Sequence, residues 1–336
     1  MGPVSPALPA LRRALLGLDD ETARRVLPAL DWMRARGSGD DPEPDLVAAY
    51  LREELPRLTV GAGHEAHEVA WALADVFDAA GLDAQAALCR APATHERLAV
   101  RRWAVSFPHV PDAFWQPALD VLDRLPAVPQ RVRLSLVSAS GLLEAVGDGL
   151  PLTPEGTLLP ETVMVLDDRF RWTEEFPWMH AETEPDIPPL GFLHRHLLGQ
   201  RLLVHDGGRV RPTDEGVACR RDLPRLWRAV VTPAPRWRQP FEHDTLGVMA
   251  VSLLRAPAFT PGRVAEELSH VLAAKWSSAT DRSVFDRASV VVQEWYQLGV
   301  PLGWWDSGRG PADRRPNAFG RAAAGAVLRA VANRPE

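Results

Sequence analysis

The chain of 336 residues has few of the residue types that mark metal or redox chemistry. Its two cysteines, Cys89 and Cys219, form neither a CxxC motif nor a dense disulfide framework, so we expect both thiols to be reduced and buried. Lys275 is the only lysine beside 37 arginines, and there are only two asparagines. This bias is typical of a GC-rich genome. Arginine abundance alone therefore does not indicate nucleic-acid binding.

Long apolar runs are also missing, since nowhere do 18 apolar residues follow one another. The first ten residues contain three prolines and no basic segment followed by an apolar one, which argues against a secretory signal. With 46% hydrophobic and 24% charged residues, the chain resembles an ordinary globular protein of about two or three domains. We expect a cytoplasmic protein with no membrane partner.

Motifs for catalysis and cofactor binding are absent or poorly spaced. Neither GxGxxG nor GxxxxGK[ST] occurs, which argues against a nucleotide-binding loop. The segment HEAHE places His64 and His67 three residues apart, whereas a zincin helix needs a spacing of four. His194 and His196 are two apart and diverge on a helix. We expect no cofactor, no metal site and no catalytic residue; the remaining enzymatic alternative is a pocket built from residues distant in sequence.

The first 130 residues have helical periodicity. Leucines recur at 3-4-3 spacing over 8–18, Asp19 offers an N-cap for a second helix, and Gly37 ends that helix. An apolar stripe over 69–80 closes on Gly81, in the position that favours glycine after a helix. These patterns predict an all-α N-terminal region in which short loops join neighbouring helices.

A different pattern begins near residue 131 and occurs three times: an apolar stretch, a short turn and a helix start that closes on glycine, at 152–156, 211–216 and 315–320. The middle copy is the clearest. A helix over 190–200 leads into strands 201–205 and 209–213, which are joined by Gly207-Gly208, and a helix begins near Asp214. A helix that feeds directly into a hairpin is the core of a winged helix. The first copy, 142–156, and the third, 295–320, are looser.

The fold class that follows is mainly α: a helical N-terminal bundle, then two or three winged-helix-like units with short β-hairpins. We predict three domains, a helical domain over 1–130, winged-helix-like units one and two over 131–232, and a C-terminal winged-helix-like unit over 233–336. The proline-rich segment 232–240 marks the second boundary, because its prolines oppose both helix and central strand.

The runs GLLEAVGDGLPLTPEGTLLPETV and LLGQRLLVHDGGRVRPTDEGVACRRD, within 131–222, resemble the C-terminal region of an uncharacterised family of plasmid-type open-reading-frame proteins common in GC-rich bacteria. The run AAGLDAQAALCRAPATHERL, within 69–97, is also similar to helical sequence in those proteins. The resemblance covers about two-thirds of the chain. It implies a fold with winged-helix-like repeats and no established activity.

Charge points to one region for binding. Residues 201–336 carry 20 basic and 14 acidic side chains, although the net charge is −6. The segment 190–238 is the predicted nucleic-acid contact, because a duplex-binding winged helix places basic or amide side chains on the helix before the hairpin and basic ones on the hairpin. His194, His196 and Gln200 lie on that helix. The predicted contact residues are Arg195, Arg201, Arg209, Arg211, Arg220, Arg221, Arg225 and Arg228.

Acidic residues argue against nucleic-acid binding by this region. They lie at 167–168, 174–175, 182, 184 and 186, and they repel phosphate if they share the same face.

Among twelve tryptophans, adjacent Trp304 and Trp305 should face opposite ways, and an exposed ring there would contact a protein partner. The leading prediction is a non-enzymatic binding protein, either binding nucleic acid or regulating transcription. The alternative is a helical scaffold or protein-interaction module with no nucleic-acid role.

Overall fold

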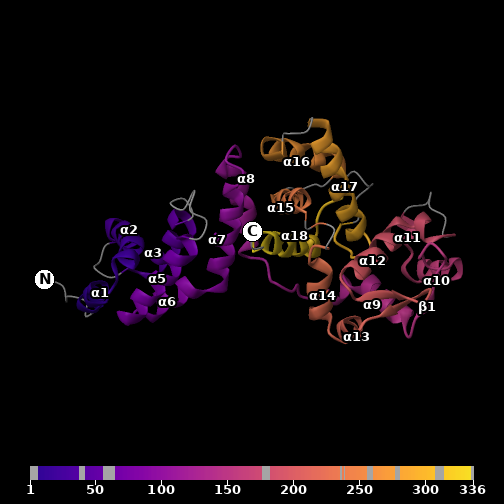
Figure 1. Cartoon of the computed structure of the whole chain (residues 1–336), viewed down its shortest axis with the longest axis horizontal. Coiled ribbons are helices and arrows are strands. Elements are labelled where there is room, and N and C mark those ends of the chain that lie inside the picture. Colours follow the sequence, from indigo (N-terminus) through magenta and orange to yellow (C-terminus); the bar gives the residue numbers. More distant parts are fainter. Residues whose placement is uncertain are drawn as a thin grey trace. The chain divides into compact units, whose positions relative to one another are not determined.

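The computed structural model describes residues 7–37, 42–55, 65–175, 182–234, 237, 239–255, 260–276, 281–306 and 314–333. The fold is mainly helical, with one small three-stranded sheet in these ranges, as the sequence predicts (Figure 1). The chain divides into two compact units. Unit 1 covers Met1–Pro108 with the last two residues, and unit 2 covers His109–Arg334.

Unit 1 is a bundle of short helices. They are α1 (Ala7–Leu16), α2 (Asp20–Arg36), α3 (Pro44–Ala49), the π-helical turn η1 (Tyr50–Glu54), α5 (Glu65–Ala79), α6 (Asp83–Arg90) and α7 (Pro92–Val105). The predicted caps are confirmed: Asp19 accepts from the N–H groups of Glu21 and Thr22, and Gly81 has a φ of +74° after α5. α5 lies in the centre, packed on α1, α2 and α6, with Leu73 and Phe77 fully buried.

The first half of unit 2 alternates helices with very short strands. The order is α8 (Asp112–Leu122), η2 (Val132–Leu134), α9 (Val137–Val146), β1 (Leu150–Pro151), α10 (Pro160–Phe170), α11 (Trp172–Glu175), η3 (Glu184–Asp186), α12 (Pro188–Gly199), β2 (Leu203–Asp206), β3 (Arg209–Pro212), α13 (Asp214–Arg221) and α14 (Leu223–Val231).

The second half is helical and packs around one central helix. It comprises α15 (Pro240–Arg255), α16 (Pro261–Trp276), α17 (Asp281–Gly299) and α18 (Ala318–Ala332). Every residue of α15 from Asp244 to Leu254 is buried, because α8, α16, α17 and α18 all pack on it. Among the described residues, none of the helices combines the length and apolarity that a membrane crossing requires.

The sheet corrects one expectation. β3 lies in the middle, antiparallel to both neighbours, in the order β1-β3-β2. Leu150 pairs with Val210, and Leu203 pairs with Pro212. The first predicted copy, 142–156, is therefore no separate hairpin unit: its strand completes the sheet of the second. Both belong to one arrangement of α9, β1, α10, α12, β2 and β3.

The third predicted copy has less strand than expected. A single antiparallel bridge joins Trp305 and Pro316, and α18 begins after Asn317, whose side chain accepts from the N–H groups of Phe319 and Gly320. The glycine-rich tip predicted at 306–310 falls, after Asp306, outside the described residues. The helix start on Asn317 is as predicted, whereas the hairpin is reduced to one bridge in the described part.

The division of the chain also differs from the predicted boundary near residue 130. The guanidinium of Arg329 on α18 donates to the carbonyls of Leu122 and Leu125, at 3.0 and 3.2 Å, and α8 packs on α15. Residues 109–130 therefore belong to unit 2. The second predicted boundary, at 232–233, lies inside unit 2 and stays a prediction.

Candidate nucleic-acid interface

The β2–β3 hairpin carries the best-placed basic side chains. Gly207 and Gly208 form its turn with φ values of +55° and +74°, a conformation that L side chains rarely adopt. Along β3 the side chains alternate, so Val210 is buried in the core while Arg209 and Arg211 are exposed on the other face. The hairpin thus presents two guanidinium groups on one surface, as the sequence predicts for Arg209 and Arg211.

These two arginines lie side by side over Gly149, the residue before β1. A Cβ atom placed on Gly149 would lie 3.0 Å from Arg211 Cγ and 3.3 Å from Arg209 Nε. Arg209 donates to the Gly149 carbonyl, and Arg211 Nε lies 3.5 Å from the Asp206 carboxylate. The contact with exposed Asp206 is the one ion pair of these two arginines among the described residues, and both guanidinium groups remain on the surface.

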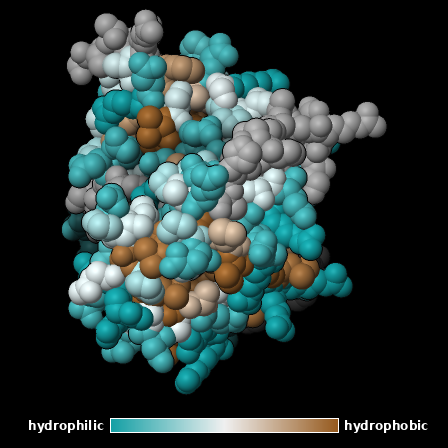
Figure 2. Space-filling model, turned by 90° about the vertical axis from the view of Figure 1, so that its right-hand side faces the viewer, coloured by the Kyte–Doolittle hydropathy of each residue, from teal (hydrophilic) through white to brown (hydrophobic). Residues whose placement is uncertain are grey.

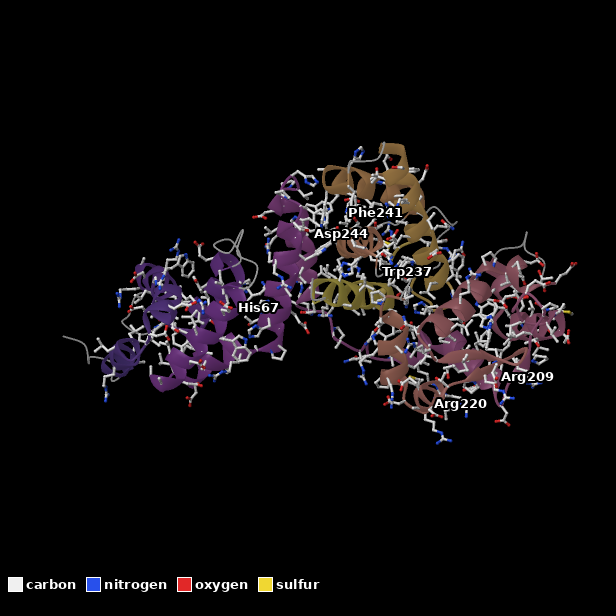
Figure 3. All side chains as sticks on the ribbon, in the orientation of Figure 1. His67, Arg209, Arg220, Trp237, Phe241 and Asp244 are labelled. Atoms are coloured by element: carbon white, nitrogen blue, oxygen red, sulfur yellow. The ribbon has the colours of Figure 1, made fainter. Side chains whose placement is uncertain are left out.

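A second basic surface lies on α13 and α14. Arg221 and Arg228 are exposed and Arg220 is half-buried, and none of the three forms an ion pair within the ranges that the structure describes. Figure 3 shows Arg209 and Arg220 pointing outward along the same lower edge of unit 2. The predicted arginines of the hairpin and of α13 therefore occur on neighbouring exposed parts of this unit.

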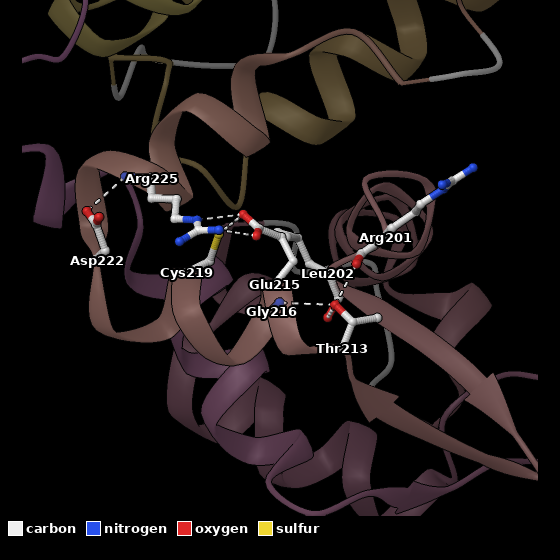
Figure 4. Close-up of polar contacts among 8 residues, drawn as sticks. All are labelled: Arg201, Leu202, Thr213, Glu215, Gly216, Cys219, Asp222 and Arg225. Carbon is white, nitrogen blue, oxygen red and sulfur yellow. Dashed lines mark hydrogen bonds and ion pairs between the residues drawn. The ribbon is translucent and has the colours of Figure 1, made fainter.

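Arg225 is not available in the same way, because it is bound to Glu215. Its Nε lies 2.7 Å from Glu215 Oε1, and its Nη2 binds the second carboxylate oxygen (Figure 4). The Glu215 hydrogen bonds raise the pKa of Arg225, and those same bonds from Arg225 lower the pKa of Glu215. The predicted role of Arg225 in phosphate binding thus requires breaking a bidentate ion pair.

Arg195, on α12, and Arg201, between α12 and β2, are both exposed. The Arg195 guanidinium lies over the Phe192 ring, 4.6 Å from its centroid. Arg201 has a φ of +56°, and its carbonyl accepts from the Thr213 hydroxyl at 2.6 Å (Figure 4). The backbone of Arg201 therefore closes the base of the hairpin, while its side chain extends into solvent.

The helix before the hairpin, α12, is the main departure from the sequence prediction. Only Arg195 is exposed on it, and His194 and His196, expected to face solvent or DNA, are 2% and 1% exposed. His196 Nε2 donates to the Val230 carbonyl at 2.7 Å, and Gln200, just after the helix, donates to Thr232. α12 packs on α17. These polar side chains bind backbone carbonyls within unit 2 and do not form a surface that could contact DNA bases.

His194 pairs with Glu184, which is 3% exposed. His194 Nδ1 lies 3.0 and 3.2 Å from the two carboxylate oxygens, and the Leu158 N–H donates to the same carboxylate at 2.7 Å. Because an ionised carboxylate only accepts, Nδ1 carries the hydrogen. Burial raises the pKa of Glu184, but the hydrogen bonds from His194 and Leu158 outweigh it and lower the pKa below its usual value.

The His205 ring lies beside this pair, 5.7 Å from the His194 ring. Burial and the neighbouring His194 lower the pKa of His205. The described residues contain no group of three or more His, Cys, Asp or Glu side chains suited to holding a metal ion. The Glu184–His194 pair is therefore best described as a buried link between η3, α12 and the turn before α10.

The acids expected to repel phosphate do not all face solvent. Asp167 is buried and accepts from the backbone N–H and the hydroxyl of Thr173, and Glu184 is buried against His194. Asp168, Glu174, Glu182 and Asp186 remain exposed. The predicted acidic surface is thus reduced, because part of it forms hydrogen bonds inside the unit.

The expectation of an exposed ring at Trp304-Trp305 is wrong. Trp304 is fully buried and stacks near Trp295, with ring centroids 4.6 Å apart. Trp305 is 8% exposed and donates from Nε1 to the Tyr296 carbonyl at 3.1 Å. The sequence alternation fails because Trp304 packs against Trp295 and Trp305 against Tyr296, both on α17, so that both rings lie inside unit 2.

Two other polar clusters identified in the sequence have structural partners. The Lys275 ammonium pairs with the buried Asp244 carboxylate at 2.7 Å, and the Trp276 indole donates to the same oxygen. In unit 1, the Nδ1 atoms of His67 and His95 lie 2.9 Å apart, and His95 stacks on Trp71. His64 lies outside the described residues. Figure 3 labels His67 in unit 1 and Asp244 in unit 2.

Comparison with known proteins adds no identification. The chain matches no protein-family model, no curated protein and no solved structure. The resemblance of 131–222 to plasmid-type open-reading-frame proteins therefore stays a prediction, and any function has to be argued from the surfaces of this chain.

Proposed function

We propose that this chain is a non-enzymatic binding protein that contacts nucleic acid through a winged-helix domain over residues 137–221. The order α9, β1, α10, α12, β2, β3 and the strand order β1-β3-β2 support this reading. In such a domain α12 takes the place of the helix that enters a groove, and the β2–β3 hairpin is the wing. From here on, the wing means residues 203–212.

The observation that carries the proposal is the exposed pair Arg209 and Arg211 over Gly149. Guanidinium groups bind phosphate oxygens with two parallel hydrogen bonds, and such contacts hold a protein on a duplex. Val210 separates the two arginines on β3, so both guanidinium groups extend from the same face of the strand. Arg220, Arg221 and Arg228 extend this basic surface.

Fluorescence anisotropy with a labelled duplex of about 20 base pairs tests the proposal, at about 50 mM salt, where the phosphate contribution is strongest. The test variant is R209E/R211E. The control is R24E/R34E, which changes net charge equally on exposed positions of α2 in unit 1. We expect R209E/R211E to weaken binding at least tenfold and the control to weaken it less than threefold. Equal loss in both variants, or no binding by the wild type, would contradict the proposal.

Protein contact is the second candidate, favoured by exposed apolar side chains on the same unit. Met164 and Val165 on α10 are 56% and 66% exposed, and Val204 on the wing is 44% exposed. Figure 2 shows hydrophobic atoms gathered between hydrophilic ones on the side of unit 2 where α10 lies. Such surfaces are typical of contacts with other proteins. Under this alternative, neither duplex nor single-stranded DNA changes the anisotropy at low salt.

A further inference from the structure

Two helices of unit 2, α12 and α17, connect to the next helix through the same backbone contacts. In the first copy α12 is followed by Arg201, with a φ of +56°, and the Leu202 N–H donates back to the Leu197 carbonyl at 2.9 Å. In the second copy α17 is followed by Gly303, with a φ of +60°, and the Trp304 N–H donates back to the Gly299 carbonyl, also at 2.9 Å. Both helices thus end in the same left-handed turn.

The return from the hairpin is also the same in both copies. The Leu202 carbonyl accepts from the Thr213 N–H and the Trp304 carbonyl accepts from the Asn317 N–H, each at 3.0 Å. Thr213 and Asn317 then cap the next helix by accepting from a glycine N–H three residues later, each at 3.1 Å. Those glycines are Gly216 and Gly320.

Each glycine lies tightly against the first residue of its hairpin. A Cβ atom on Gly216 would lie 2.0 Å from the Leu202 carbonyl oxygen, and one on Gly320 would lie 2.4 Å from the Trp304 carbonyl oxygen. Matching turns, caps and close approaches make α17 the counterpart of α12. The second copy therefore runs from α15 through α18, with α17 in the place of the reading helix.

These two counterpart helices pack against each other (Figure 1). A row of buried aromatic rings runs from α12 to α17. The ring centroid of His196 on α12 lies 6.1 Å from that of Trp237, and the Trp237 centroid lies 6.1 Å from that of Trp295 on α17. The Trp237 indole donates to Glu294 on α17 at 2.8 Å. This contact buries the side of α12 that faces α17, and Arg195 is the one residue of α12 that is exposed.

We infer that the partner of the wing is duplex DNA of any sequence, bound through its phosphates without reading of the bases. This inference rests on the proposed function. Base recognition in a helix-turn-helix domain comes from side chains of the reading helix, and only Arg195 is exposed on α12. The arginines of the wing remain, and contacts to phosphates carry no sequence information.

The test uses the full chain and a library of duplexes with about 20 random base pairs, selected over several rounds at about 50 mM salt. Unrelated clones and the starting pool are then titrated by anisotropy. We expect no enriched motif and affinities within about threefold of one another, since base-reading proteins prefer their site by about 10³-fold or more. R209E/R211E should weaken binding to every duplex by the same factor, and R24E/R34E should weaken it less than threefold.

A motif bound more than tenfold better than the pool would overturn the inference while leaving nucleic-acid binding in place. Absence of binding to all duplexes would overturn the proposed function and this inference together. A selected duplex in which some phosphates are replaced by neutral methylphosphonates distinguishes phosphate contacts from base contacts. Weaker binding after this replacement supports the inference, whereas unchanged binding contradicts it.

Discussion

His194 Nδ1 lies 3.0 Å from Glu184 Oε1 in the interior of unit 2, where both side chains are almost fully buried. The pair joins η3 to the middle of α12, and the second carboxylate oxygen holds the Leu158 N–H before α10. Removing one partner of a buried hydrogen-bonded pair leaves the other unsatisfied. The Glu184–His194 pair should therefore be one of the most sensitive polar contacts of the unit.

We predict that Glu184→Gln lowers the free energy of unfolding of unit 2 by about 3 kcal/mol at pH 7. The pKa of Glu184 is lowered in the folded state, so its ionisation stabilises the fold above the ordinary carboxyl pKa near 4.5. That contribution is lost as the pH falls through the lower, folded-state pKa. The difference between wild type and variant should therefore shrink in acid.

Urea unfolding at pH 7 and at lower pH values measures this difference. Glu174→Gln is the matched control, because Glu174 is exposed and pairs only with exposed Arg171 in the described residues. We expect the control to change stability by less than about 0.5 kcal/mol. A difference for Glu184→Gln that stays constant as the pH falls would show that its ionisation does not stabilise the fold.

The second prediction concerns the two glycines that close the hairpins. Gly216→Ala and Gly320→Ala each force a methyl group against a carbonyl oxygen, and both should lower stability by about 2–3 kcal/mol. Gly262→Ala is the control, since nothing lies within 4 Å of its Cβ position in α16, and it should be neutral or slightly stabilising. Thermal unfolding of the three variants measures this. Similar melting temperatures for all three variants would contradict the close approach of these two glycines to the carbonyl oxygens.

The third prediction concerns the thiols. Burial raises the pKa of both Cys89 and Cys219 to about 12, and the hydrogen bond with Glu215 also raises that of Cys219. Since the thiolate is the reactive form, neither cysteine should react with a disulfide reagent at pH 8 in the folded protein. In urea, both should react. Rapid reaction of one thiol without urea would mean that its side chain is accessible.

Local features of the fold could be predicted from the sequence because they depend on neighbouring residues. The Asp19 cap, Gly81 after α5 and the Gly207-Gly208 turn all follow from short-range hydrogen bonding and backbone preference. The exposed arginines of the wing could be predicted for the same reason, since alternation along a strand decides which face each one takes.

Contacts between distant segments could not be predicted. Leu150 pairs with Val210 across sixty residues, and no sequence pattern indicates that strand β1 joins the later hairpin. The polar residues His194 and His196 are buried, with one ring nitrogen of each bonded to Glu184 or to the Val230 carbonyl, and composition alone does not reveal these partners. The packing of α12 on α17, which buries one side of α12, belongs to the same class of long-range contact.

The salt dependence of duplex binding by the wild type and by R209Q/R211Q tests the central claim most directly. Each phosphate contact contributes about 0.9 to the slope of log K against log salt. We predict that the variant has a slope smaller in magnitude by about 2, with weaker binding to every sequence at low salt. Equal slopes for the two proteins would contradict the claim that Arg209 and Arg211 bind the phosphates.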